Sequence, residues 1–192
     1  MTNIPKLIAA NGERWKDCEI LPTREREVRK YAQRVCLPVP KAAYQNIEKD
    51  TDVPWFVIAV IHYRECGLNW MGNLAQGDPW NHISTHVPRG RGPFTNFHDA
   101  AVDALTKCPP YAAKWKDWSA GGVLTILELY NGTGYEDWHH EASPYIWGAT
   151  NHEEWGKYTA DGHWSGQVWD TQIGCAALLK SMMALDASIK ID

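Results

Sequence analysis

Apolar residues recur along most of this chain at intervals of three and four, the spacing that places them on one face of an α-helix. The pattern predicts short helices on both sides of a central, more apolar segment. The predicted ranges are 5–19, 23–36, 41–49, 97–107, 118–130 and 170–186. Asn131-Gly132 is expected to close the helix over 118–130, and Asp170 is expected to cap the helix that follows it.

The central segment, "DTDVPWFVIAVIHYREC", is apolar around most of its circumference, which is typical of a buried helix. Asp52 suits the N-cap of this helix, and Pro54 suits its first turn. Gly67 is well placed to end it. We therefore expect a helix at the centre of the core that stops just after Glu65.

The pattern changes in the next segment, "WMGNLAQGDPWNHISTHVP". Asp78-Pro79 is a turn signal, and the β-branched residues of "HISTHV" fit a short strand. These features predict a small β-hairpin over 70–88. The residues from 132 to 169 are expected to form a long, aromatic and mostly irregular loop, which is often functional in a compact domain. The predicted fold class is α+β, predominantly α-helical.

Composition narrows the class of protein. With 192 residues, 44% of them hydrophobic and 22% charged, the chain has the size and balance of one soluble domain. A formal net charge of −4 without long basic runs argues against nucleic-acid binding. We expect no membrane span and no signal peptide, because the apolar runs are too short. The protein is thus expected to stay in the cytoplasm unless another protein lets it out.

Cysteine and tryptophan usage add two further points. The five cysteines are scattered and include no CxxC pair, so reduced thiols are expected rather than a disulfide framework or a zinc site. The chain holds 11 tryptophans against three phenylalanines. Tryptophan serves both cores and sugar-binding platforms, so this count is compatible with carbohydrate binding without requiring it.

Glu65 raises a chemical question, because a carboxylate closes the most apolar segment of the chain. Helical spacing places it beside Ile58 and Ile61, and apolar surroundings raise the pKa of a carboxyl group. A carboxyl that keeps its proton near neutrality can act as a general acid. The alternative is structural: Glu65 reaches solvent at a frayed helix end or pairs with Arg64.

Asp78 is the acidic residue that follows Glu65 in the predicted hairpin. Glycoside hydrolysis with inversion needs a second carboxylate that activates water, and a hairpin folded back on the helix would bring Asp78 opposite Glu65. Ser84 and Thr85 lie across the hairpin, where a hydroxyl could orient that water. His86 shares a strand face with Ser84 and could touch substrate. The alternative for Asp78 is to cap its own turn.

A glutamate at the end of a buried helix, followed by Asp and Ser/Thr, resembles the phage-type branch of the lysozyme superfamily. The pattern of that branch is Glu-x8-Asp-x5-Thr. Here Asp78 and Ser84 fit Asp-x5-Ser, and Thr85 stands one place later. Twelve residues rather than eight separate Glu65 from Asp78, which is a departure from the pattern.

Longer stretches look like a lysozyme-like group found in phages and bacterial genomes. They are "LAQGDPWNHISTHVPRGRGPF", "AAVDALTKCPPYAAKWKDWSAGGVLTILELYNGTGY" and "SPYIWGATN", within about residues 40–186. The resemblance implies an α-rich, two-lobed, lysozyme-like fold. We expect one catalytic domain over 1–192, with a catalytic core at 51–190. The predicted helices of 1–50 are expected to cover this core, and the alternative is a small wall-binding domain.

The resemblance also points to binding residues later in the chain. Related lytic transglycosylases carry a Tyr-Asn-x-Gly element at a helix end that faces the cleft, and a later tyrosine near the catalytic glutamate. Tyr130 and Asn131 match the first element, and Tyr145 matches the second. Helix capping and core packing are the alternatives for these residues. Trp80, Tyr135 and Trp147 are candidates for stacking on sugar rings, with core packing again the alternative.

Histidines and glutamates gather in "WHHEASPY" and "NHEEW", within residues 139–153. Imidazole and carboxylate groups can bind metals, but no HExxH spacing is present. We expect no metal and no organic cofactor. His62 stands one turn before Glu65 on another helix face, where a core or capping role is expected.

The expected function is that of an endolysin, a peptidoglycan-cleaving glycoside hydrolase with Glu65 as acid and Asp78 as water activator. The expected partners are the glycan strands of the bacterial cell wall and a holin-type pore for release, and the chain is expected to act as a monomer. A lytic transglycosylase, which needs Glu65 alone, is the first alternative. A non-catalytic sugar-binding protein with the same fold is the second.

Overall fold

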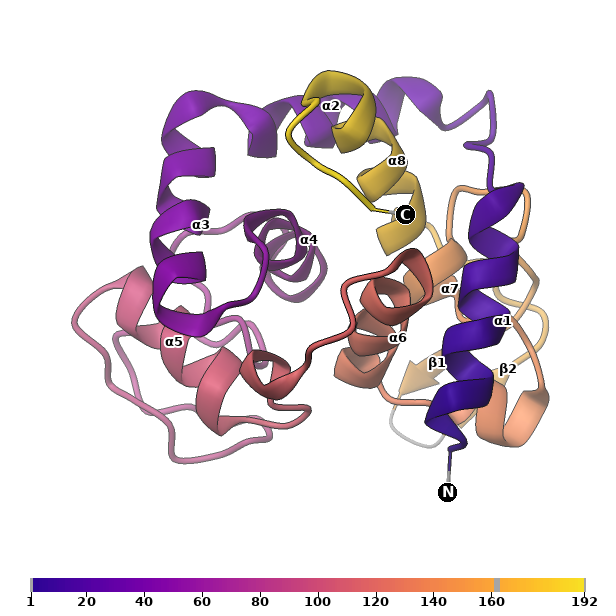
Figure 1. Cartoon of the computed structure of the whole chain (residues 1–192). Coiled ribbons are helices and arrows are strands. Elements are labelled where there is room, and N and C mark those ends of the chain that lie inside the picture. Colours follow the sequence, from indigo (N-terminus) through magenta and orange to yellow (C-terminus); the bar gives the residue numbers. More distant parts are fainter. Residues whose placement is uncertain (1, 161–162, 192) are drawn as a thin grey trace. The chain divides into compact units, whose positions relative to one another are not determined.

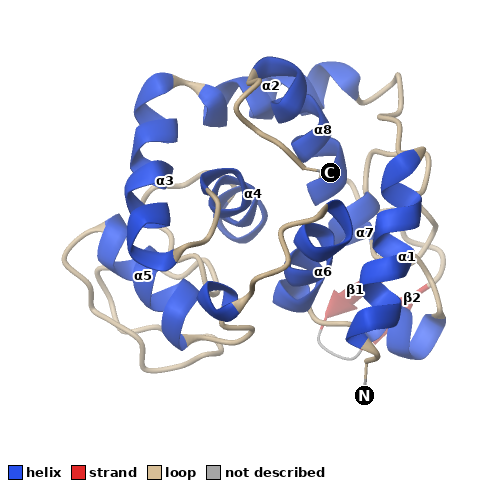
Figure 2. Cartoon of the chain, viewed as in Figure 1, coloured by secondary structure: helices blue, strands red, loops and turns tan. Residues whose placement is uncertain are grey.

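The computed structural model describes residues 2–160 and 163–191, and most of these are helical (Figures 1 and 2). The α-helices are α1 (Ile4–Lys16), α2 (Glu25–Cys36), α3 (Pro38–Thr51), α4 (Trp55–Cys66), α5 (Phe97–Lys107), α6 (Ala120–Asn131), α7 (Pro144–Trp147) and α8 (Cys175–Leu185). Short helical turns are η1 (Ala112–Lys114) and η2 (Tyr135–His139). Strands β1 (Lys157–Ala160) and β2 (His163–Ser165) pair antiparallel. The predicted class, α+β and predominantly α-helical, is confirmed at this level.

The chain divides into two compact units. The first combines residues up to Gln33 with residues from Asp117 onward, and the second is the continuous segment Arg34–Lys116. In the first unit α1 packs along α6, and α7 contacts both α6 and α8. In the second unit α3 contacts both α4 and α5 (Figure 1). The boundary expected at residue 50 falls at the end of α3, inside the second unit, and the single catalytic domain over 1–192 stays a prediction.

Helix α4 forms the core of the second unit, as its apolar sequence predicts. Every residue from Trp55 to Tyr63 is buried. Gly67 ends the helix in the left-handed conformation, with φ of 58°, and its N–H donates to the carbonyls of His62 and Tyr63. The expected N-cap is wrong: Asp52 closes α3 instead, also in a left-handed conformation. The N-cap of α4 is Pro54, which carries no capping side chain.

The predicted hairpin over 70–88 is wrong. Segment 67–96 consists of turns and irregular backbone, with one isolated bridge between Gly72 and Pro79. Proline lacks an N–H and so interrupts the hydrogen bonds between paired strands. In this segment, side chains accept hydrogen bonds from backbone N–H groups that strand pairing would otherwise use. Asp78 accepts from the N–H groups of Thr85 and His86, and such local bonds compete with strand pairing.

The strands that the structure describes lie within the segment expected to be mostly irregular. Tyr158 pairs with Trp164, and Lys157 pairs with Ser165. Asp170, expected to cap the helix over 170–186, instead accepts from the ammonium of Lys157 and from the N–H of Gln172. Helix α8 begins later, with Gly174 as its N-cap. As predicted, Gly132 closes α6.

No helix in the described parts of the chain combines the length and the apolar character that crossing a bilayer requires.

Candidate functional site

Glu65 lies in the last turn of α4 and is half-buried. The next residue, Cys66, donates its thiol to the carbonyl of Asn73, 3.2 Å away. Burial raises the pKa of the Cys66 thiol to about 12, and the negative charge of Glu65 adds to this rise. Glu65 therefore lies at the edge where α4 meets the segment that follows it, partly covered by protein and partly open to water.

That segment folds back onto the end of α4 at Gly77. A β-carbon placed on Gly77 would lie 2.7 Å from the carbonyl oxygen of Glu65, closer than β-carbons approach other atoms in proteins. Gly77 also has a φ of +76°, a conformation that residues with a side chain rarely adopt. The close approach brings Asp78, the next residue, to the end of the helix that carries Glu65. A glycine turn, rather than a hairpin, thus folds this segment back on the backbone of Glu65. The expectation that the carboxylates of Asp78 and Glu65 face each other stays a prediction.

The carboxylate of Asp78 is surrounded by donors. Its Oδ2 accepts from the backbone N–H groups of Thr85 at 2.8 Å and His86 at 3.1 Å, and from the Thr85 hydroxyl at 3.4 Å. Its Oδ1 lies 2.6 Å from Nδ1 of His86. These contacts lower the pKa of Asp78 to about 2, with the backbone bond from His86 as the largest cause. Asp78 is therefore ionised at neutral pH.

Ser84 has a different place from the one predicted. It is buried, and its hydroxyl donates to the carbonyl of Pro88 at 3.0 Å and accepts from the N–H of Arg91 at 2.9 Å. These bonds close the loop between residues 84 and 91. The structure thus brings Thr85 and His86 to Asp78 and gives Ser84 an internal, loop-forming position.

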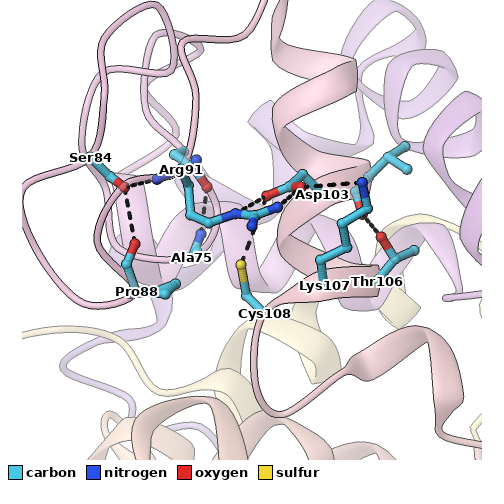
Figure 3. Close-up of polar contacts among 10 residues, drawn as sticks. Ala75, Ser84, Pro88, Arg91, Asp103, Thr106, Lys107 and Cys108 are labelled. Atoms are coloured by element: carbon cyan, nitrogen blue, oxygen red, sulfur yellow. Dashed lines mark hydrogen bonds and ion pairs between the residues drawn. The ribbon is translucent and has the colours of Figure 1, made fainter.

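An ion pair fixes this loop to α5 (Figure 3). The guanidinium of Arg91 meets both carboxylate oxygens of Asp103, through Nε at 2.8 Å and through a very short contact from Nη2. The side chain of Asp103 is 7% exposed and that of Arg91 is 32% exposed. Two-pronged contact of this kind is the strongest geometry for an arginine–carboxylate pair. Through Ser84 and Arg91, the Asp78 loop is therefore held on a helix of the core.

Aromatic rings support the other side of the segment. Trp70 stacks on Tyr44 with ring centroids 5.3 Å apart and packs edge-on against Phe97 at 4.7 Å. Trp80 is half-buried, and its indole N–H donates to the carbonyl of Trp70 at 2.8 Å. The stacking role proposed for Trp80 stays a prediction. The sequence reasoning missed Trp70, although Trp70 follows α4 directly.

His62 has the core role that was expected. Its Nδ1 lies 2.8 Å from the hydroxyl of Tyr44, and its Nε2 lies 3.0 Å from the carbonyl of Asn69. Burial lowers the pKa of His62 to about 4, so its ring is neutral and can accept from Tyr44 while donating to Asn69. These two bonds tie α3 to the chain that leaves α4.

The remaining candidates belong to the first unit. Tyr130 is half-buried and Asn131 is exposed, both at the end of α6. Tyr145 is 5% exposed, which leaves little surface for a substrate. The binding roles of these three residues stay predictions.

Two of the proposed stacking residues are core residues instead. Trp147 is fully buried with 0% exposure, and Tyr135 is 5% exposed. The hydroxyl of Tyr135 accepts from the N–H of Tyr158 at 3.1 Å, and the rings of Tyr135 and Tyr158 meet edge to face. A sugar ring cannot stack on a covered face, so the prediction for both side chains is wrong.

A buried carboxyl in the first unit escaped the sequence reasoning. Glu128 of α6 is 2% exposed and accepts one bond, from the Nδ2 of Asn11 at 3.0 Å. Burial raises the pKa of Glu128 to about 7, against lowering effects of Asn11 and Arg14. The signal was present in "VLTILELY", where a glutamate interrupts an apolar helix just as Glu65 does.

The histidines and glutamates of residues 139–153 point to separate partners. His139 lies 3.0 Å from the hydroxyl of Tyr158, His152 lies 3.0 Å from Asp17, and Glu153 accepts from the N–H of Ala149. In the part of the chain that the structure describes, no group of three or more His, Cys, Asp or Glu residues converges as metal ligands would.

Comparisons of this chain with models of protein families, with curated proteins and with solved structures found no match.

Proposed function

We propose that the protein is a peptidoglycan-cleaving glycoside hydrolase in which Glu65 is the general acid. The observation that supports the proposal is the close approach of the turn before Asp78 to the backbone of Glu65 at the end of α4. Glu65 is half-buried in the last helical turn, and the glycine turn before Asp78 packs on the carbonyl of Glu65. Glycosidases work with a pair of carboxyl groups, one that donates a proton and one that stays charged.

The two carboxyl groups would have different roles in this reaction. Glu65 would protonate the oxygen that links two sugars, so that the bond to the leaving sugar breaks. Asp78 stays ionised because its pKa is about 2, and its negative charge would stabilise the positive charge that develops on the sugar ring. The hydroxyl of Thr85, 3.4 Å from Asp78, would help Asp78 to orient the attacking water on the opposite face of the sugar, and Asp78 would take up the proton that this water loses.

The same geometry favours a second candidate, a lytic transglycosylase. The oxygens of Asp78 already accept from two backbone N–H groups and from the His86 ring, and a carboxylate with a pKa of about 2 is a weak base. Transglycosylation needs no water activator and would use Glu65 alone. Mass spectrometry of the released muropeptides separates the two: reducing ends indicate hydrolysis, and anhydro ends indicate transglycosylation.

The test of the proposed function compares the parent protein with Glu65→Gln on purified cell walls. Gln keeps the shape of the side chain and cannot donate a proton as an acid does, so wall clearing should fall by about a hundredfold or more. Glu48→Gln is the matched control, because Glu48 is half-buried in the same unit and burial raises its pKa. Equal clearing by the parent and Glu65→Gln, or no clearing by the parent, refutes the proposal. The latter result would favour a non-catalytic sugar-binding protein.

The endolysin setting of this activity is part of the proposal. A wall-degrading enzyme of this kind would accumulate in the host cytoplasm and reach the wall through a holin-type pore.

A further inference from the structure

Two tryptophans form a pair on the surface of the first unit. Trp155 precedes β1 and is 61% exposed, and Trp169 follows β2 and is partly exposed. Their ring centroids are 4.9 Å apart, with an angle of 63° between the planes. Tryptophan buries a large apolar area when it can, so a pair that stays at the surface calls for an explanation.

The pair is held by the chain on both sides. The N–H of Gly156 donates to the carbonyl of Val168 at 3.1 Å, which aligns the two segments next to the rings. One residue further along, the ammonium of Lys157 lies 2.8 Å from Asp170, whose side chain is 3% exposed. Because these bonds hold the backbone on both sides of the rings, binding on the rings costs less ordering entropy than binding on an unsupported loop.

The charge of the region narrows the class of ligand. From Glu153 to Asp170 the sequence holds four acidic residues and one lysine, and that lysine is ion-paired with Asp170. Anionic lipid surfaces and nucleic acids attract basic side chains that are free to pair with phosphate. The lysine and the arginine described in this region are already engaged. Lys157 pairs with Asp170. The guanidinium of Arg24 donates to the carbonyl of Thr171 and to Glu27. Exposed aromatic rings among uncharged and acidic polar groups suit an uncharged ligand with an apolar C–H face and hydroxyl groups at its rim, which describes a sugar.

We propose that Trp155 and Trp169 form a binding platform for a strand of β-1,4-linked N-acetylated sugars. The pyranose C–H face stacks on Trp155, and Trp169 supports that ring from the side. The choice of N-acetylated sugars among carbohydrates rests on the proposed function, whereas the platform itself rests on the exposure and fixation of the two rings. This site belongs to the first unit, and Glu65 and Asp78 belong to the second.

The experiment measures binding with the full chain carrying Glu65→Gln, so that substrate is not consumed. Retention on purified peptidoglycan is measured by sedimentation, and soluble chitin oligosaccharides are titrated by calorimetry. Adding Trp155→Ala should weaken both by about tenfold or more, whereas Trp155→Phe should restore part of the binding. The matched control is Trp138→Ala, because Trp138 is 77% exposed but lies on η2, outside the pair. Circular dichroism confirms that each variant is folded.

Unchanged binding in Trp155→Ala, or an equal loss in Trp138→Ala, overturns the platform. Binding to vesicles of anionic lipid that depends on Trp155, without binding to either glycan, also overturns it. Failure of the platform and failure of the enzymatic proposal are distinguishable. If the parent clears walls and Trp155→Ala binds normally, the platform is refuted and the enzymatic proposal stands. If the parent clears no walls but its binding depends on Trp155, the enzymatic proposal is refuted and the platform stands.

Discussion

The ring of His86 lies 2.6 Å from Oδ1 of Asp78, and the backbone N–H of the same residue donates to Oδ2. One residue thus contacts both oxygens of the carboxylate, from the side chain and from the main chain. His86 is 75% exposed at its side chain whereas Asp78 is 14% exposed, so the carboxylate lies under the imidazole. Asp78 therefore stabilises the conformation of its loop, in addition to being a candidate for catalysis.

The first prediction concerns Asp78→Asn. Asparagine can still accept from the two backbone N–H groups but loses the charge, so the free energy of unfolding should fall by about 1 kcal/mol. If the protein hydrolyses glycans, wall clearing should fall by about a hundredfold, because the charge that supports the transition state is gone. Chemical denaturation and turbidity assays measure the two effects. Clearing at the parent rate with anhydro products would instead assign the chemistry to Glu65 alone.

The second prediction concerns acid. The pKa of Asp78 is lowered from 3.8 to about 2, so its native contacts stabilise the fold fully above pH 3.8. This contribution is lost as the pH falls from 3.8 through 2, because in that range the unfolded chain takes up a proton at this carboxyl and the folded chain does not. Stability measured between pH 2 and 5 should show this loss in the parent, and it should be weaker in Asp78→Asn. An identical slope in both proteins would contradict the assignment.

The third prediction concerns Gly77→Ala. The new β-carbon would meet the carbonyl of Glu65 at 2.7 Å and would force a left-handed residue, so unfolding free energy should fall by about 2–3 kcal/mol. Gly90→Ala is the control: it has a similar φ of +79° but open space around it. It should cost about 1 kcal/mol, the backbone part alone. Equal losses of unfolding free energy in the two variants would contradict the close contact between Gly77 and the end of α4.

The fourth prediction concerns the Arg91–Asp103 pair. Arg91→Met leaves the buried carboxylate of Asp103 with the longer ion pair to Lys107 at 3.9 Å, which should cost about 2 kcal/mol of unfolding free energy. The cost is moderated because Arg91 is a third exposed. The double variant Arg91→Met with Asp103→Leu should be more stable than Arg91→Met, because no poorly paired buried charge remains. Urea titration of the three proteins measures this coupling. Additive losses would show that the two side chains act independently.

The fifth prediction concerns Glu128, whose pKa is raised from 4.5 to about 7. Below pH 4.5 this carboxyl is protonated in both the folded and the unfolded chain and has no effect. Between pH 4.5 and 7 only the folded chain keeps the proton, so stability falls as the pH rises, by up to roughly 3 kcal/mol. Above pH 7 the loss is complete. Thermal unfolding between pH 4 and 8 should show this slope, and Glu128→Gln should flatten it.

Much of the helical structure could be predicted from the sequence, because burial of one face imposes a regular spacing. The helix expected over 97–107 is α5, and the apolar run that ends at Gly67 is α4. Helix starts were less predictable. Asp52 has the side chain of an N-cap, but the tight connection between α3 and α4 requires a left-handed residue there, so Asp52 ends one helix instead of beginning the next.

The loop that follows α4 was beyond local reasoning. "HISTHV" has the composition of a strand, yet contacts distant in the sequence decide its conformation: Asp78 bonds to residues 85 and 86, and Arg91 bonds to Asp103. Likewise, no periodicity marks which aromatic residues of 132–169 are buried, so Trp147 and Trp155 looked alike in the sequence. Glu65 and Asp78 were proposed as catalytic residues because carboxylates in those settings have a chemical use, and their catalytic roles stay predictions.

The division of the chain has a consequence for its synthesis on the ribosome. Helix α1 packs on α6, and about a hundred residues separate the two in the sequence. At typical elongation rates α1 therefore waits roughly 5–20 s for its partner. The continuous segment Arg34–Lys116 has no such delay and can fold while α6 is still being made. A nascent chain would thus carry the apolar side of α1 uncovered, and this interval is when binding by a chaperone would matter most.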